Sequence, residues 1–409
     1  MPGFCGKFSM RQEKIVQILA YHVHLWYNAG IIKKEMPKRG KTMFAAYPSA
    51  VPVGSGHNYI LLGHRHLTLR AYLAAYPGLS DKWRFYHQNG VDSTFADGAV
   101  AYRNRLGGRW TIVRARIGIG QPSSGAEMDT PDPVTDWVDV TYGGKTSREV
   151  LPGECFFSDE VTLSLPEGHD LVWEWEIDGE DIPSTPDSQA ATFTDTGDGF
   201  SFLEEAPLPD LFGNARPVKG RIAFLGDSIT QGCQTRKNRY EMWAGRIARA
   251  LAPDYASWNL GLGFGRGADM ATDGFWMRKA KTADIACVAY GVNDLLSGPY
   301  GLGRGASADE VLLTIETIVK KLQDHSLRVI VFTVPPFHYD PSVRAVWETV
   351  DRALPSLCDS LGAELFDFAA VLDAKHPYGD VCNYGPHPNG EGGRLVCEAF
   401  LQSGALRQQ

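Results

Sequence analysis

The second half of the chain alternates between short apolar runs and longer segments in which apolar residues recur every three or four positions. The short runs predict strands at 221–225, 256–260, 284–290, 328–334 and 363–367. The longer segments predict helices at about 238–252, 267–281, 308–324, 342–361 and 391–402. Strands and helices that alternate in this way indicate a parallel sheet covered by helices on both faces.

The first half has a different pattern. Residues 51 to about 216 mostly lack the helical period and contain short runs that alternate apolar and polar residues, such as 109–114, 161–165 and 171–177. Glycine and proline stand at turn positions between these runs. Many short strands with frequent turns predict an antiparallel β-sandwich. In the second half, five strands fit an α/β fold with a flavodoxin-like, doubly wound parallel sheet.

These patterns predict three parts of the chain. Residues 1–50 form an N-terminal extension, which contains a charged stretch with proline and glycine at 33–41. Residues 51–215 form the β-sandwich domain, and residues 216–409 form the α/β domain, after a boundary segment at 208–218. The role of the extension does not follow from its sequence.

Candidate chemistry lies where predicted strands of the second half end. The run 222–225 leads directly into Gly226-Asp227-Ser228, and Asn293 follows the apolar run 285–290. Open α/β sheets bind their ligands at the carboxyl ends of their strands, where a serine hydroxyl can be exposed and a backbone N–H can bind an anion. Gly-Asp-Ser alone is common in turns, so the wider context decides its meaning.

Four blocks in order supply that context, because they resemble the SGNH (GDSL-type) hydrolases. The matching segments begin with Gly-Asp-Ser-Ile-Thr at 226–230 and continue at 259–265, 291–294 and 387–392. They are similar to that superfamily's serine, glycine, Gly-x-Asn-Asp and histidine blocks. The G-x-S-x-G elbow of the α/β-hydrolases is absent around Ser228. The resemblance implies a serine esterase that needs no metal and no cofactor.

The same resemblance implies a role for each block. Ser228 would be the nucleophile and His387 the base, while Asp227 would fix the turn. The oxyanion hole would combine the Ser228 N–H, the Gly265 N–H and the Asn293 side-chain amide. Gly263 is an alternative to Gly265, because the spacing of the glycine block fits either residue.

The histidine and its orienting acid leave a choice. His376 also precedes a proline, and Asp373 stands three residues before it, as in the Asp-x-x-His-Pro pattern that is usual in this superfamily. His387 is preferred because a polar turn and a helix pattern follow it. Three residues before His387 stands Tyr384, so either Asp380 orients the histidine, which completes a triad, or a backbone carbonyl does so in a Ser–His dyad.

The sandwich half resembles, more loosely, the jelly-roll domain that precedes the SGNH domain in a set of two-domain bacterial esterases. The phrases that carry this likeness lie at 103–108, 142–145 and 152–159. The layout implies a carbohydrate acetylesterase acting on small acyl esters. The alternatives are a lipase or thioesterase for longer acyl chains, and a non-catalytic carbohydrate-binding protein.

Composition and charge narrow the partners. The formal net charge of −8 gives no basic footprint for nucleic acid or an anionic membrane, so the expected partner is a small ester or acetylated carbohydrate. The seven cysteines lack C-x-x-C spacing and suggest neither a metal site nor a disulfide framework. Polar residues interrupt the apolar run at 15–27, which predicts no signal peptide and a cytoplasmic protein. A homo-oligomer is compatible with the sequence.

Overall fold

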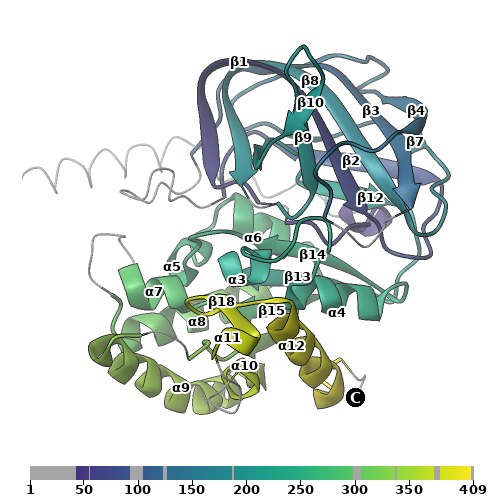
Figure 1. The fold of residues 1–409 in the computed structure, drawn as a ribbon. Coiled ribbons are helices and arrows are strands. Elements are labelled where there is room, and N and C mark those ends of the chain that lie inside the picture. Colours follow the sequence, from purple (N-terminus) through teal and green to yellow (C-terminus); the bar gives the residue numbers. More distant parts are fainter. Residues whose placement is uncertain are drawn as a thin grey trace, which may run out of the picture. The chain divides into compact units, whose positions relative to one another are not determined.

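A five-stranded parallel sheet forms the centre of the C-terminal half of the chain (Figure 1). Its strands, in spatial order, are β14 (Tyr255–Gly261), β13 (Gly220–Gly226), β15 (Ile285–Ala289), β16 (Arg328–Phe332) and β17 (Glu364–Phe366). All four neighbouring pairs are parallel. The first strand therefore lies between the second and the third, which is the flavodoxin-like order. The predicted fold class is confirmed.

The structure is a computed structural model that describes residues 43–54, 56–92, 105–122, 127–186, 188–297, 305–336, 339–372 and 378–406. Phe44–Gln409 form one compact unit. Nearly all of the predicted extension lies outside the described residues. The division of the chain at residues 51 and 216 stays a prediction.

The helices that flank the parallel sheet largely follow the predicted apolar stripes. They are α4 (Trp243–Leu251), α5 (Gly267–Met270), α6 (Phe275–Ala280), α8 (Ala308–Gln323), α9 (Pro341–Leu361) and α12 (Gly390–Ser403). In α8, a capping box between Ser307 and Glu310 begins the helix, and its apolar stripe is buried. α8 packs against α9, and α12 packs against α4.

Two predicted helices differ from the structure. The helix expected from 238 begins at Trp243, because Asn238 and Tyr240 adopt positive φ angles of 53° and 50° that a right-handed helix excludes. The helix expected at 267–281 is two short helices, α5 and α6, with Gly274 as the N-cap of the second. The apolar period continues across the break, which is why the pattern alone predicted one helix.

Two antiparallel sheets form the β-sandwich. The larger sheet has the order β10 (Phe200–Phe202), β9 (Ala191–Asp195), β1 (Tyr59–Ala74), β8 (His169–Pro186), β3 (Trp110–Pro122) and β4 (Thr135–Val140), with β5 (Arg148–Val150) on β3 and β11 (Glu205–Ala206) on β8. The smaller sheet has the order β12 (Leu211–Asn214), β2 (Lys82–Gln88) and β6 (Cys155–Phe157), with β7 (Val161–Thr162) on β2. The predicted antiparallel β-sandwich is confirmed.

Aromatic side chains fill the space between these two sheets. Trp173 of the larger sheet lies with its ring centre 4.7 Å from that of Phe85 and 6.0 Å from that of Phe212, both on the smaller sheet. Trp173 and Trp175 are buried, so they belong to the core of the sandwich.

A buried ion pair joins the sandwich to the α/β part. Lys279 of α6 is fully buried, and its Nζ lies 2.6 Å from Asp92 and 2.8 Å from Asp210. Burial lowers the pKa of Lys279, but the two carboxylates outweigh this effect and hold the pKa above its usual value. Removing one partner of such a pair would leave an uncompensated buried charge, so the contact fixes the two parts together.

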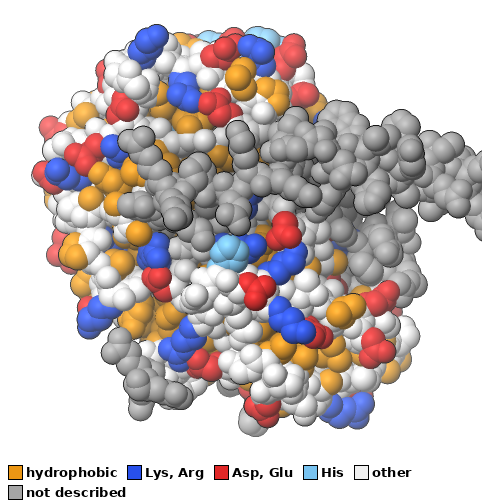
Figure 2. Space-filling model, turned by 180° about the vertical axis from the view of Figure 1, so that it is seen from behind, with side chains coloured by type: hydrophobic (Ala, Val, Ile, Leu, Met, Phe, Trp, Pro, Cys, Tyr) orange, Lys and Arg blue, Asp and Glu red, His pale blue; other side chains and the backbone are white. Residues whose placement is uncertain are grey.

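Acidic and basic side chains are interspersed over the described surface that Figure 2 shows. On this face the two signs of charge alternate and do not gather in one patch. Within the described ranges, none of the helices is long and apolar enough to span a bilayer.

Candidate active site

Ser228 stands at the sharp turn between β13 and α3 (Ser228–Gln231). The turn requires Gly226, because a Cβ at this position would lie 2.0 Å from the Thr230 hydroxyl and 2.8 Å from the Ala289 carbonyl. Asp227 caps the helix, and its carboxylate accepts a hydrogen bond from the Ile229 N–H at 2.9 Å. The turn therefore places Ser228, which is partly exposed, at the carboxyl edge of the sheet.

Asp227 is buried beside this serine. Burial raises the pKa of Asp227 to about 7, and repulsion from Asp294 adds to the increase, while the Ile229 N–H acts in the opposite direction. This hydrogen bond of its carboxylate lies within the turn. This placement fits the predicted role of Asp227 in fixing the turn.

His387 reaches the serine from the far end of the chain. It begins β19 (His387–Pro388), which forms a small hairpin with β18 (Cys382–Tyr384). Asn389 then caps α12 by accepting hydrogen bonds from two backbone N–H groups at 2.9 and 3.0 Å. The His387 Nε2 lies 2.7 Å from the Ser228 Oγ. A hydroxyl and an imidazole at this distance form a nucleophile and base arrangement.

The Asn293 block lies at the same edge of the sheet as the serine. Strand residue Gly226 pairs with Ala289, and α7 (Val292–Ser297), which carries Asn293, follows shortly after that strand. The Asn293 side-chain amide donates a hydrogen bond to the Gly265 carbonyl at 2.9 Å. Asp294 accepts hydrogen bonds from the two N–H groups that begin α5, at 2.8 and 3.0 Å. The second and third blocks are therefore fastened together.

The two glycine candidates for the oxyanion hole have occupied N–H groups. The Gly265 N–H donates to the Leu262 carbonyl at 2.9 Å, within a tight turn. The Gly263 N–H donates to the Gln231 Oε1 at 2.6 Å. The prediction for Gly265, with Gly263 as its alternative, therefore requires a bound oxyanion to replace one of these internal acceptors.

The orienting acid predicted for His387 is Asp380. It lies on α11 (Tyr378–Val381) with its side chain exposed, and its backbone carbonyl accepts a hydrogen bond from Asn389 at 3.1 Å. Over the described ranges its carboxylate makes no hydrogen bond to His387. The triad with Asp380 thus has no supporting contact and stays a prediction. The alternative pair, Asp373 and His376, lies outside the described residues.

Two side chains that the sequence analysis did not single out hold the glycine loop in place. The Gly263 N–H donates to Gln231, and the Gly263 carbonyl accepts a hydrogen bond from the Asn58 side chain at 2.9 Å. Gln231 also donates to the Pro186 carbonyl at the end of β8, at 3.0 Å. Both side chains are buried. The nucleophile helix, the glycine loop and the sandwich are therefore connected through Gln231.

We expect Gln231→Met to lower kcat for p-nitrophenyl acetate roughly tenfold with little change in KM, because methionine keeps the volume but leaves the buried Gly263 N–H unsatisfied. Steady-state kinetics would measure the change. The exposed Gln234, changed to Asn, is the matched control, since asparagine tolerates its φ of 70°. A lower unfolding temperature with an unchanged kcat would show that Gln231 only stabilises the fold.

The fold and the site together define a class. A serine at a strand end and a histidine at hydrogen-bond distance, on a doubly wound sheet, are the groups that an acyl-transfer hydrolase needs. Residues 224–395 match the model of the GDSL-like Lipase/Acylhydrolase family. This part of the chain belongs to the SGNH, or GDSL-like, hydrolase superfamily, and the protein is a carboxylic ester hydrolase.

Solved structures with a similar fold cover less than half of the chain. They include a putative lipolytic protein of the G-D-S-L family from Desulfitobacterium hafniense, with 19% identity over 44% of this chain and 98% of that one, at a TM-score of 0.38. An acetylxylan esterase from Geobacillus stearothermophilus is 18% identical over 47% of this chain and 96% of that one, at a TM-score of 0.39. A putative GDSL-like lipase from Parabacteroides merdae is 18% identical over 46% of this chain and 97% of that one, at a TM-score of 0.40. No curated protein matches the chain.

Among the described residues, no group of three or more His, Cys, Asp or Glu side chains is placed to hold a metal ion.

Proposed function

We propose that the protein is a serine esterase that removes small acyl groups, specifically acetyl groups, from carbohydrates. The observation that carries the proposal is the 2.7 Å distance between the Ser228 Oγ and the His387 Nε2. This distance is within the range for a hydrogen bond from a hydroxyl to a neutral imidazole nitrogen. It allows proton transfer without any further movement of the two side chains.

The reaction would proceed through an acyl-enzyme. His387 accepts the Ser228 proton at Nε2 as the Ser228 oxygen attacks the ester carbonyl carbon, and a tetrahedral intermediate forms. The imidazolium then donates this proton to the leaving alcohol oxygen, and the bond from that oxygen to the carbonyl carbon breaks. Water attacks the acyl-enzyme in the same way, which releases the acid and restores the serine.

Two donors of the proposed oxyanion hole belong to Ser228 and Asn293. At the first position of α3, the Ser228 N–H has no partner carbonyl inside the helix, as at every helix N-terminus. The Asn293 amide has two hydrogens, and one donates to the Gly265 carbonyl. Such donors stabilise the negative charge of the tetrahedral intermediate more than that of the substrate.

The preference for acetylated carbohydrate rests on the two-part layout. The β-sandwich contacts the nucleophile helix through Gln231 and is fastened to α6 through the buried Lys279. The sandwich is thus firmly joined to the part that carries the serine. This arrangement agrees with the two-domain esterases that the sequence resembles.

A series of p-nitrophenyl esters from acetate to palmitate, together with acetate release from acetylated xylo-oligosaccharides, tests the proposal. We expect kcat/KM to be highest for acetate and to fall by at least about tenfold by octanoate. Each methylene that a small acyl pocket cannot hold would cost about 1 kcal/mol or more of transition-state binding. Ser228→Ala is the control for background hydrolysis. A maximum at long chains would point to a lipase or thioesterase, and no hydrolysis of any ester would point to a binding protein.

A further inference from the structure

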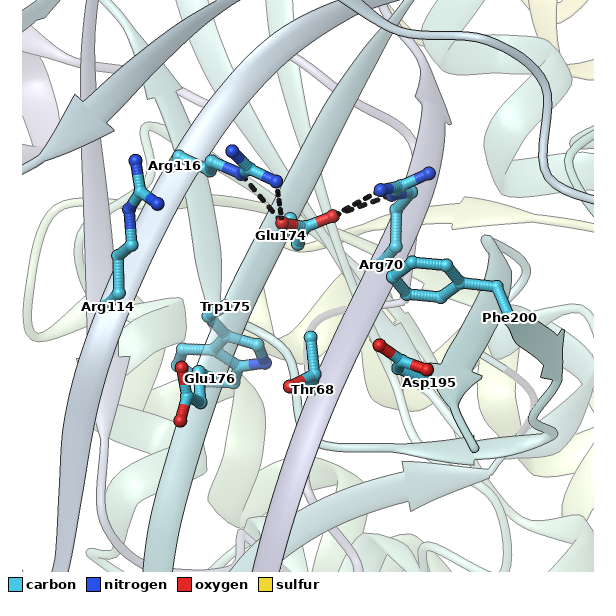
Figure 3. Close-up of a pocket in the computed structure, with 9 residues that line it drawn as sticks. All are labelled: Thr68, Arg70, Arg114, Arg116, Glu174, Trp175, Glu176, Asp195 and Phe200. Atoms are coloured by element: carbon cyan, nitrogen blue, oxygen red, sulfur yellow. Dashed lines mark hydrogen bonds and ion pairs between the residues drawn. The ribbon is translucent and has the colours of Figure 1, made fainter. Parts of the chain in front are cut away.

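The outer face of the larger sandwich sheet carries a hollow of about 270 Å³ (Figure 3). Its walls come from neighbouring strands in register. Glu174 on β8 pairs with Arg70 on β1 and with Arg116 on β3. All three side chains extend over this face, which is opposite to the buried Trp173.

The first row of side chains is rigid. The Glu174 carboxylate accepts hydrogen bonds from Arg70 at 2.6 and 2.8 Å and from Arg116 at 2.6 Å. The Arg70 guanidinium lies 4.1 Å above the centre of the Phe200 ring, and the Arg116 guanidinium lies 4.2 Å above that of Trp137. With only 9% of its side chain exposed, Glu174 is an expensive group to bury unless its charge is paired. The row thus presents fixed guanidinium N–H groups at the edge of the hollow.

A second row lies two residues further along the strands and is more open. Here Glu176 pairs in register with Thr68 and with Arg114, and Asp195 of β9 adds a second carboxylate. The Arg114 side chain is 51% exposed and pairs with Asp139 at 2.8 Å, and the Glu176 side chain is 37% exposed and lies 3.3 Å from His66. Each exposed group still has further N–H groups or oxygen lone pairs, so the second row supplies both donors and acceptors to a ligand.

The charges that line the hollow cancel. Three arginines face three carboxylates, those of Glu174, Glu176 and Asp195. A site with no net charge does not favour a phosphate or an isolated acid over a neutral ligand. A sugar hydroxyl both donates and accepts a hydrogen bond, so adjacent guanidinium and carboxylate groups match a pair of neighbouring hydroxyls.

We propose that this hollow binds a neutral oligosaccharide, as a site separate from the Ser228 centre. Its volume is close to the lower end of small-molecule pockets, about 300 Å³, which suits one or two sugar rings of a longer chain. Ser228, His387 and the glycine loop at 259–265 are not among the residues that line the hollow. Binding there does not depend on the proposed esterase activity, although it would hold an acetylated carbohydrate near the enzyme.

The test uses the full chain with Ser228→Ala, titrated by calorimetry with three neutral sugars, xylotetraose, cellotetraose and mannotetraose, and with the acidic trigalacturonate for comparison. We expect at least one of them to bind with a dissociation constant below about 1 mM. Thr68→Trp should fill the hollow without disturbing the Glu174 row, and should weaken this binding at least about tenfold. Thr111→Trp, on β3 but outside the hollow, is the matched control and should bind like the parent.

Three results would overturn the proposal: none of the three sugars binds at about 10 mM, Thr68→Trp binds as tightly as Thr111→Trp, or only trigalacturonate binds. Asp195→Ala is a second variant that should also weaken sugar binding. It removes a carboxylate that lines the hollow and leaves the Glu174 row unchanged, because the exposed Asp195 side chain lies outside that row. In the chain that retains Ser228, Thr68→Trp should hydrolyse p-nitrophenyl acetate at the parent rate. If the parent chain hydrolysed no ester but still bound the sugar, the proposed function would be contradicted and this site would stand.

Discussion

Replacing Ser228 by alanine is expected to lower kcat for p-nitrophenyl acetate by roughly 10⁴- to 10⁶-fold. The change removes the oxygen that would attack the ester. It leaves the turn intact, because Asp227 supplies the helix cap and the serine hydroxyl bonds to His387, outside the turn. Steady-state kinetics would measure the loss, and the unfolding temperature should stay within a few degrees of the parent.

The exposed Ser360 on α9 provides the matched control, since Ser360→Ala removes the same atom at a position outside the four blocks. It should keep the parent rate. If Ser228→Ala retained activity within about tenfold of the parent, the nucleophile would have to be another group.

His387→Ala is expected to cost about as much as the serine change, roughly 10⁴-fold or more, because a nucleophile and its base act as a unit. The imidazole is the base that lies at hydrogen-bond distance from the Ser228 hydroxyl, and the variant removes it. His376→Ala is the comparison, and it should keep most of the activity. A large loss at His376 and a small loss at His387 would move the base to the alternative pair with Asp373.

The orienting group is tested by Asp380→Asn in the same assay. Since the Asp380 carboxylate does not bond to His387, we expect a rate close to that of the parent. A loss of several orders of magnitude would favour a triad in which Asp380 approaches the histidine when substrate binds.

The order of the parallel strands and the pairing of distant blocks could be predicted from the sequence. The apolar cores of the runs at 221–225, 284–290 and 328–334, which are 222–225, 285–288 and 329–334, are buried, as expected for central strands covered on both faces. Ser228 and His387 are 159 positions apart, yet the blocks that contain them were enough to bring them together. The candidate chemistry thus follows from the resemblance of these blocks to the SGNH hydrolases.

The contacts that support the site were not predictable in this way. Asn58 and Gln231 hold Gly263 through bonds that span 205 and 32 positions, and neither belongs to a spacing pattern. The internal acceptors of the Gly263 and Gly265 N–H groups were not predictable either, because they depend on tertiary packing. The local sequence predicts the candidate catalytic residues, but not the residues whose hydrogen bonds fix the loops around them.

The most direct test of the account is to identify the residue that becomes covalently modified. Treatment with diisopropyl fluorophosphate, followed by trypsin digestion and fragment mass spectrometry, locates the label within the peptide 222–236. The account predicts one diisopropylphosphoryl group on Ser228, appearing in step with the loss of esterase activity and much more slowly in His387→Ala. Loss of activity with Ser228 unlabelled, or with the label on another residue, would contradict it.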